Sequence, residues 1–177
     1  MIALKKENDI KDFQLFSGDI LIKGEHATMA KFLCKTSEKK NAMDKRKPAD
    51  VFRNIFDVYI VAAVIGLECG LREAEDKKSK DETRIFADKV IKEKNNLDFV
   101  YELAMLVDNS QGLDADTKIA RAFKKENIKE NFELFNSYVR GGIRWLYENF
   151  TNSATTHEDY LEKIYEIVDE FREIHNI

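Results

Sequence analysis

PADVFRNIFDVYIVAAVIGL, the sequence of residues 48–67, carries apolar side chains in nearly every direction around a helix axis. Pro48 suits the first turn of a helix, where its missing N–H costs no hydrogen bond. A buried strand is the competing interpretation of residues 58–65, but the consecutive alanines and the helical spacing before them favour a helix. We therefore predict a central helix over residues 48–67 that other helices enclose.

The overall composition favours helices around this segment. Among 177 residues, 44% are hydrophobic and 35% are charged, with only 7 Gly and 1 Pro. The Gly- and Pro-rich turns that sandwiches and barrels need are therefore scarce. Since no repeat of fixed period and no linker divides the chain, we expect residues 1–177 to form a single all-α domain. The predicted architecture is an irregular bundle of about six or seven helices.

The first residues are the part of the chain with strand character. The mainly apolar segments 13–16 and 20–22 flank a turn at 17–19, which predicts a small hairpin or arm within residues 1–24. Residues 36–47 are polar without periodicity and are predicted to form a basic loop. The remaining apolar periodicity predicts helices over 26–35, 82–94, 97–107 and 132–150.

Three further signals mark helix ends and interruptions. Asp114 is suited to cap a short helix, and Thr155-x-x-Glu158 is a capping-box pattern before a final acidic helix. Gly141 and Gly142 are predicted to interrupt the long segment. Glycines in a helix cost about 1 kcal/mol each, so the pair needs a reason. Close packing against the central helix is one reason, and a kink that exposes backbone groups is the other.

Charge and cysteine content limit the function classes. The net charge of −4 gives no overall attraction to nucleic acid or to an anionic membrane. Cys34 and Cys69 are isolated, as in a reducing compartment, and the three histidines are scattered. We therefore predict no metal and no cofactor. The longest apolar run, residues 58–67, is shorter than the roughly 20 residues that span a bilayer, so we expect a cytoplasmic protein.

Motifs for phosphate loops, nucleophile elbows and kinases are absent from the sequence, and no catalytic residue is predicted. Asp57 is the polar residue that most needs a partner, because a lone buried carboxylate costs several kcal/mol. Arg140 and Arg144 are the candidate partners. A structural ion pair is the favoured interpretation, and a ligand or enzyme site around these three residues is the alternative.

A second set of candidates lies in the basic loop, where phosphate contact is the alternative to a solvated segment. These nucleic-acid candidates are Lys39, Lys40, Lys45, Arg46 and Lys47. A nucleic-acid-binding regulator would use this loop together with a later basic group. That group comprises Lys118, Arg121, Lys124, Lys125 and Lys129.

The pattern His26-Ala-x-x-x-Lys31-Phe-Leu, followed by Phe52-x-x-x-Phe56-Asp-Val-Tyr-x-x-Ala62-Ala63-x-Ile65-Gly66, resembles a known protein family. These are small helical proteins associated with bacterial DNA phosphorothioation (Dnd) and other phage-defence systems. The resemblance covers about residues 26–70. It implies an accessory subunit that acts with other proteins on DNA, and it transfers no catalytic residue.

The leading prediction is a non-enzymatic helical accessory subunit of a prokaryotic DNA-processing or phage-defence system. A basic loop and an acidic final helix give two surfaces of opposite sign, which suit a protein partner or a homo-oligomer. The alternatives are a nucleic-acid-binding regulator that uses the basic loop and an enzyme built around Asp57.

Overall fold

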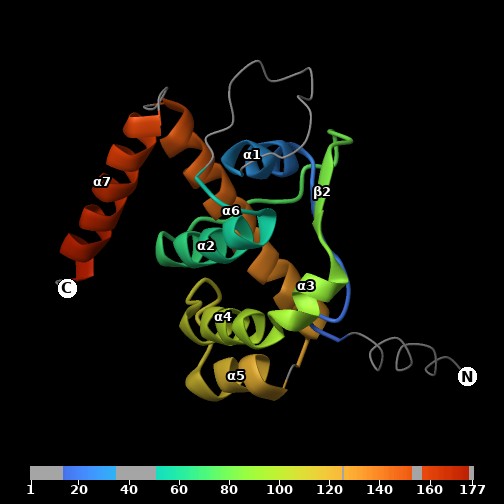
Figure 1. Ribbon diagram of the computed structural model, residues 1–177. Helices are drawn as coiled ribbons and strands as arrows, with labels where there is room; N and C mark the ends of the chain where they lie inside the picture. Colours follow the sequence, from blue (N-terminus) through green and yellow to red (C-terminus); the bar gives the residue numbers. More distant parts are fainter. Residues whose placement is uncertain (1–13, 35–50, 125, 153–156, 176–177) are drawn as a thin grey trace, which may run out of the picture.

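The computed structural model describes residues 14–34, 51–124, 126–152 and 157–175. Within them the predicted all-α class is confirmed, with seven α-helices, one short π-helical segment and two short strands. The elements are β1 (Ile20–Lys23), α1 (Glu25–Leu33), α2 (Ile55–Glu68), β2 (Glu82–Ile85), α3 (Ala87–Lys92), α4 (Lys94–Val107), α5 (Ala115–Ile119), η1 (Ala120–Lys124), α6 (Ile128–Asn152) and α7 (His157–His175). In Figure 1, α6 crosses the molecule diagonally and α7 stands apart at one side.

The predicted central helix is α2, but it begins later than the sequence pattern indicated. Residues 51–54 are not helical, and Phe52 forms a parallel bridge with Cys34 instead. The helix begins after Asn54, whose side-chain oxygen accepts a hydrogen bond from the Asp57 backbone N–H. Asn54 is a good N-cap residue, and that signal outweighs the apolar pattern before it. Pro48 lies outside the described residues.

Other helices do not enclose α2 on every side, contrary to the prediction. Val61 and Val64 are exposed, and Ile60 and Leu67 are partly exposed. The opposite face, which includes Val58, Tyr59 and Ala62, is buried. The apolar residues of α2 therefore form two faces, one that packs in the core and one that lies on the surface.

The crossing of α2 and α6 confirms that the glycine pair serves close packing. A Cβ atom at Gly142 would overlap the Ala62 carbonyl oxygen, and one at Gly66 would overlap the Tyr138 carbonyl oxygen. Gly141 likewise lies directly against the backbone of Leu71. The predicted interruption at these glycines was wrong, because α6 continues through them as one helix. Glycine here allows two helix backbones to touch.

Aromatic side chains fill the core between α2, α4 and α6. Phe135 of α6 lies at the centre, with its ring centroid 6.0 Å from Tyr59 and 5.8 Å from Tyr101. Phe16, from the segment before β1, packs edge-on to Phe135 at 6.3 Å and to Phe132 at 5.6 Å. The N-terminal segment thus contributes to the main core.

The predicted strand at 20–22 exists, but its partner comes from far along the chain. β1 pairs antiparallel with β2, with Ile20 opposite Ile85 and Lys23 opposite Glu82. Residues 13–16 were expected to supply the second strand, but residues 15 and 16 form a turn. The predicted helix over 82–94 is corrected accordingly, because residues 82–85 form β2 and α3 begins at Ala87. Pairing between such distant segments leaves no local sequence signal.

Helix α7 follows α6 and diverges from its end at an angle, at one side of the molecule (Figure 1). Phe171 packs edge-on to Trp145 at 6.3 Å, and Tyr160 lies 6.2 Å from Phe150. The capping residue Thr155 lies outside the described residues, whereas the Asp114 cap is confirmed by its bond to the Thr117 N–H. Among the described helices, none is both long and apolar enough to cross a membrane.

Candidate functional site

Glu73, in the connector of residues 69–81 between α2 and β2, is the centre of a charged network. Its carboxylate binds the Arg144 Nε–H, and its second oxygen lies 2.6 Å from His26 Nε2. Arg144 also donates to Glu25 Oε1 at 2.5 Å, which joins α6 to the start of α1. Arg140 donates to the Glu73 carbonyl oxygen at 2.8 Å. The two arginines reach the same connector because residues four apart share one face of a helix.

The expected ion pair between Asp57 and these arginines is not formed. Asp57 lies in the first turn of α2, where the Asn54 side-chain amide donates to its carboxylate at 3.0 Å. Position near a helix N-terminus also stabilises a negative charge. Arg140 pairs instead with Glu133 at 2.5 Å, and Arg144 pairs with Glu73 and Glu25. Glu73 was not predicted from the sequence because it lies in an aperiodic charged connector.

The electrostatics of Glu73 indicate a structural carboxylate. Burial opposes its ionisation, but hydrogen bonds from Arg144 and His26 outweigh burial and hold the pKa below its usual value. His26 is only 1% exposed, so a substrate cannot reach its ring. The network therefore fastens the connector to α1 and α6.

The same residues are the candidate cation ligands within the described chain. Glu25, His26 and Glu73 each place one ligand atom within 4.8 Å of the others. However, the Arg144 guanidinium already binds both carboxylates. Its positive charge opposes a cation at that position. An ion pair is the better account of this cluster.

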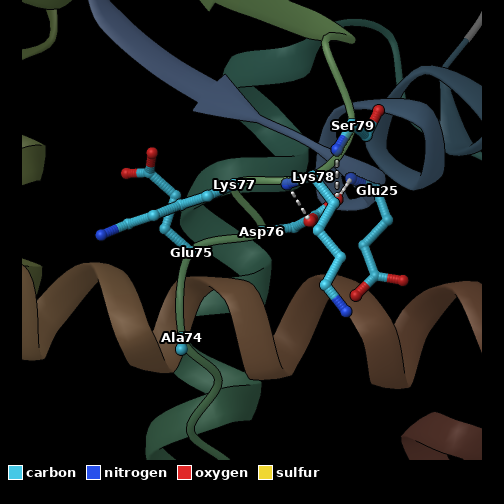
Figure 2. Close-up of a pocket in the computed structure, with 7 residues that line it drawn as sticks. All are labelled: Glu25, Ala74, Glu75, Asp76, Lys77, Lys78 and Ser79. Atoms are coloured by element: carbon cyan, nitrogen blue, oxygen red, sulfur yellow. Dashed lines mark hydrogen bonds between the residues drawn. The ribbon is translucent and has the colours of Figure 1, made fainter.

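A shallow hollow beside the network is lined by Glu25 and residues 74–79. Figure 2 shows the Asp76 carboxylate hydrogen-bonded to the backbone of neighbouring residues, with the Lys77 and Lys78 side chains pointing in different directions. Asp76 accepts backbone N–H bonds from Lys78 at 2.8 Å and Glu25 at 3.0 Å, and these bonds lower its pKa. The carboxylate is thus used to hold the connector on α1.

A second charged network joins the end of α4, η1 and α6. Asp108 accepts from the Tyr138 hydroxyl at 2.7 Å and lies 3.4 Å from an Arg121 nitrogen. Arg121 also donates to Asn131 at 2.9 Å. Burial opposes ionisation of Asp108, but the bonds from Tyr138 and Ser110 and the charge of Arg121 lower its pKa. Arg121 is therefore buried and paired, which corrects its assignment to a nucleic-acid-binding group.

The basic loop candidates cannot be placed in the same way. Lys39, Lys40, Lys45, Arg46 and Lys47 lie outside the described residues. Lys31, which precedes the loop in α1, donates to Asp81 at 2.5 Å. Lys118 of the later basic group donates to Asn109 at 2.5 Å. Nucleic-acid contact by the loop stays a prediction.

Large apolar side chains remain on the outer faces of several helices. Phe99 of α4 is 65% exposed and Tyr165 of α7 is 71% exposed. The apolar residues of α7 are divided, since Ile164 and Phe171 pack on the core whereas Tyr165 is exposed. Single exposed apolar residues are normal on a protein surface, but a row of them indicates an interaction site.

These observations define a helical protein whose described charged clusters hold its own segments together. The sequence profile of one family, DNA sulphur modification system-associated protein 4, matches residues 34–175. The chain belongs to this family, in agreement with the predicted Dnd-associated resemblance. Comparison with curated proteins and with solved structures finds no significant match.

Proposed function

We propose that this protein is a non-catalytic accessory subunit that binds another protein of a DNA sulphur modification system in the cytoplasm. Membership of the family supports the association with such a system. The binding role is supported by a contrast in the described residues between buried charged side chains and exposed apolar ones. Buried charges pair with one another, as Asp108 and Arg121 do, while large apolar groups such as Tyr165 and Phe99 face outward.

The Asp57, Arg140 and Arg144 positions support a structural role within this proposal. Asp57 lies in the first turn of α2 and accepts a hydrogen bond from the N-cap residue Asn54, and the two arginines hold the connector. An enzyme site at these residues would need a reactive group open to substrate. The guanidinium groups are instead engaged by Glu73, Glu25 and Glu133.

Co-expression tests this function directly. The tagged full chain is produced with each protein of the DNA sulphur modification system encoded in the same genome, and complexes are measured by light scattering after size exclusion. We expect a stoichiometric complex with at least one component. The proposal fails if every folded component elutes separately from the chain.

The nucleic-acid alternative has its own experiment. A gel shift at low salt with double-stranded DNA compares the wild type with a triple Lys45→Ala, Arg46→Ala, Lys47→Ala variant. Binding that declines steeply with salt and is lost in the variant would favour phosphate contact by the basic loop.

A further inference from the structure

Helix α7 has two neighbouring apolar stripes, and only the first of them faces α6. The first stripe comprises Tyr160, Ile164, Ile167 and Phe171, which are partly buried against the core. Their spacing of four, three and four residues is the spacing by which one helix packs along another. The contact between Phe171 and Trp145 shows that this stripe is already occupied.

The second stripe lies one residue further along than the first three residues of the first stripe, which is about 100° around the helix. It comprises Leu161, Tyr165 and Val168, and all three are exposed. Their spacing of four and three residues repeats the spacing of the occupied stripe. A helix with two such stripes is suited to pack between two neighbouring helices. In the described chain, α7 packs on α6.

An acidic edge borders the second stripe, again displaced by one residue. The edge comprises Glu162, Glu166, Asp169 and Glu173, which are exposed. Lys163 contacts Glu166 at 3.0 Å and Arg172 contacts Asp169 at 3.5 Å. Surface pairs of this kind contribute little free energy and can exchange partners. From Glu158 to Glu173 there are seven acidic residues and two basic ones, so the edge stays strongly negative.

We infer that the Leu161–Tyr165–Val168 stripe of α7 binds an amphipathic helix of a partner protein whose apolar face is edged by lysine or arginine. Apolar contact supplies the affinity, and opposite charge selects the partner and its orientation. A second copy of α7 would bring two acidic edges together, which opposes self-association through this surface. The inference deepens the proposed function, because it names the surface and the chemistry by which the subunit docks.

The test uses the full chain and two synthetic helical peptides. Both peptides carry the same leucine stripe, which is edged by lysine in one and by glutamate in the other. Fluorescence anisotropy should show that the lysine-edged peptide binds at least ten times more tightly than the glutamate-edged peptide. Its affinity should fall as salt is added, since the charges lie at the surface. Equal binding of the two peptides would overturn the inference.

Substitutions then locate the binding surface. Tyr165→Gln should weaken binding of the lysine-edged peptide at least tenfold, while Phe99→Gln, at a similarly exposed site on α4, should leave it unchanged. The double variant Glu162→Lys, Glu166→Lys should reverse the preference between the peptides. Circular dichroism checks that each variant is folded. Loss of binding with Phe99→Gln but not with Tyr165→Gln would place the site elsewhere and contradict the inference.

Two further outcomes separate this inference from the proposed function. If the co-expressed complex forms and survives Tyr165→Gln, the accessory function stands and the docking surface is wrong. If no component binds but the lysine-edged peptide binds selectively, the surface stands and the proposed function fails. Concentration-dependent dimers that Tyr165→Gln abolishes would assign the stripe to a second copy and overturn the inference.

Discussion

The α2–α6 crossing and helix α7 use apolar residues at helical spacing for different purposes. At the crossing, Gly66 and Gly142 let two backbones touch, and the side chains around them are buried. On α7, the apolar side chains of Leu161, Tyr165 and Val168 are exposed. Small residues thus allow two helices to pack closely within the fold, whereas a row of exposed large residues indicates a binding surface.

The largest expected effect comes from adding a side chain at the crossing. Alanine normally stabilises a helix by about 1 kcal/mol relative to glycine. At Gly142, however, its Cβ atom would meet the Ala62 backbone. We therefore expect Gly142→Ala to lower the free energy of unfolding by more than about 3 kcal/mol and Gly142→Val to prevent folding. Urea titration measures both effects.

Gly18 is the control for that substitution. It lies in open space with nothing within 4 Å of an added Cβ atom. Gly18→Ala should leave the urea midpoint almost unchanged. A stable Gly142→Ala variant would show that α2 and α6 can move apart at the crossing and that other contacts stabilise the fold.

Removing one partner of the buried network should have the next largest effect. Arg121→Met leaves the Asp108 carboxylate, which is 2% exposed, without its cation. A buried charge that loses its partner costs about 3 kcal/mol. Thermal unfolding of this variant should be compared with that of Lys124→Met, an exposed cation of the same segment. Similar melting temperatures for the two variants would contradict the structural role of Arg121.

Glu73→Gln should have a smaller effect that depends on pH. Because the pKa of Glu73 is lowered in the folded protein, its charged form stabilises the fold above the usual glutamate pKa of about 4.3. That stabilisation is lost as the pH falls through the folded pKa. We expect the variant to be about 1 to 2 kcal/mol less stable at pH 7.

The pH dependence is measured by denaturant titration from pH 7 to pH 3. The difference in unfolding free energy between wild type and Glu73→Gln should shrink at the acid end. A difference that stays constant over this range would mean that the Glu73 charge does not hold the connector in place.

The smallest expected effect is on the stability of α7 itself. Tyr165→Gln should change the free energy of unfolding by less than about 0.5 kcal/mol, because the side chain is exposed. Ile167→Ala, on the stripe that packs on the core, should cost about 1 kcal/mol or more. Differential scanning calorimetry on the two variants compares the stripes. Equal destabilisation would show that Tyr165 contributes to the fold.

The sequence predicted the fold class and most of the helices because amphipathic spacing is a local property. It placed the start of α2 too early because the apolar pattern extends beyond the Asn54 cap. It could not find the β1–β2 pairing or the Glu73 network, since both depend on contacts between distant segments. Asp57 was chosen because a buried carboxylate needs a cationic partner. In the structure the Asn54 side chain donates a hydrogen bond to this carboxylate instead. That residues 1–177 form one domain stays a prediction.

Amide hydrogen exchange of the full chain, with and without the lysine-edged peptide, tests the central contrast most directly. We predict slow exchange in α2 and around the glycines of α6 under both conditions. Exchange in α7 should be faster in the free protein and should slow when the peptide is added. The account is contradicted if, without the peptide, exchange in α7 is as slow as in α2. It is also contradicted if the bound peptide protects only residues outside α7.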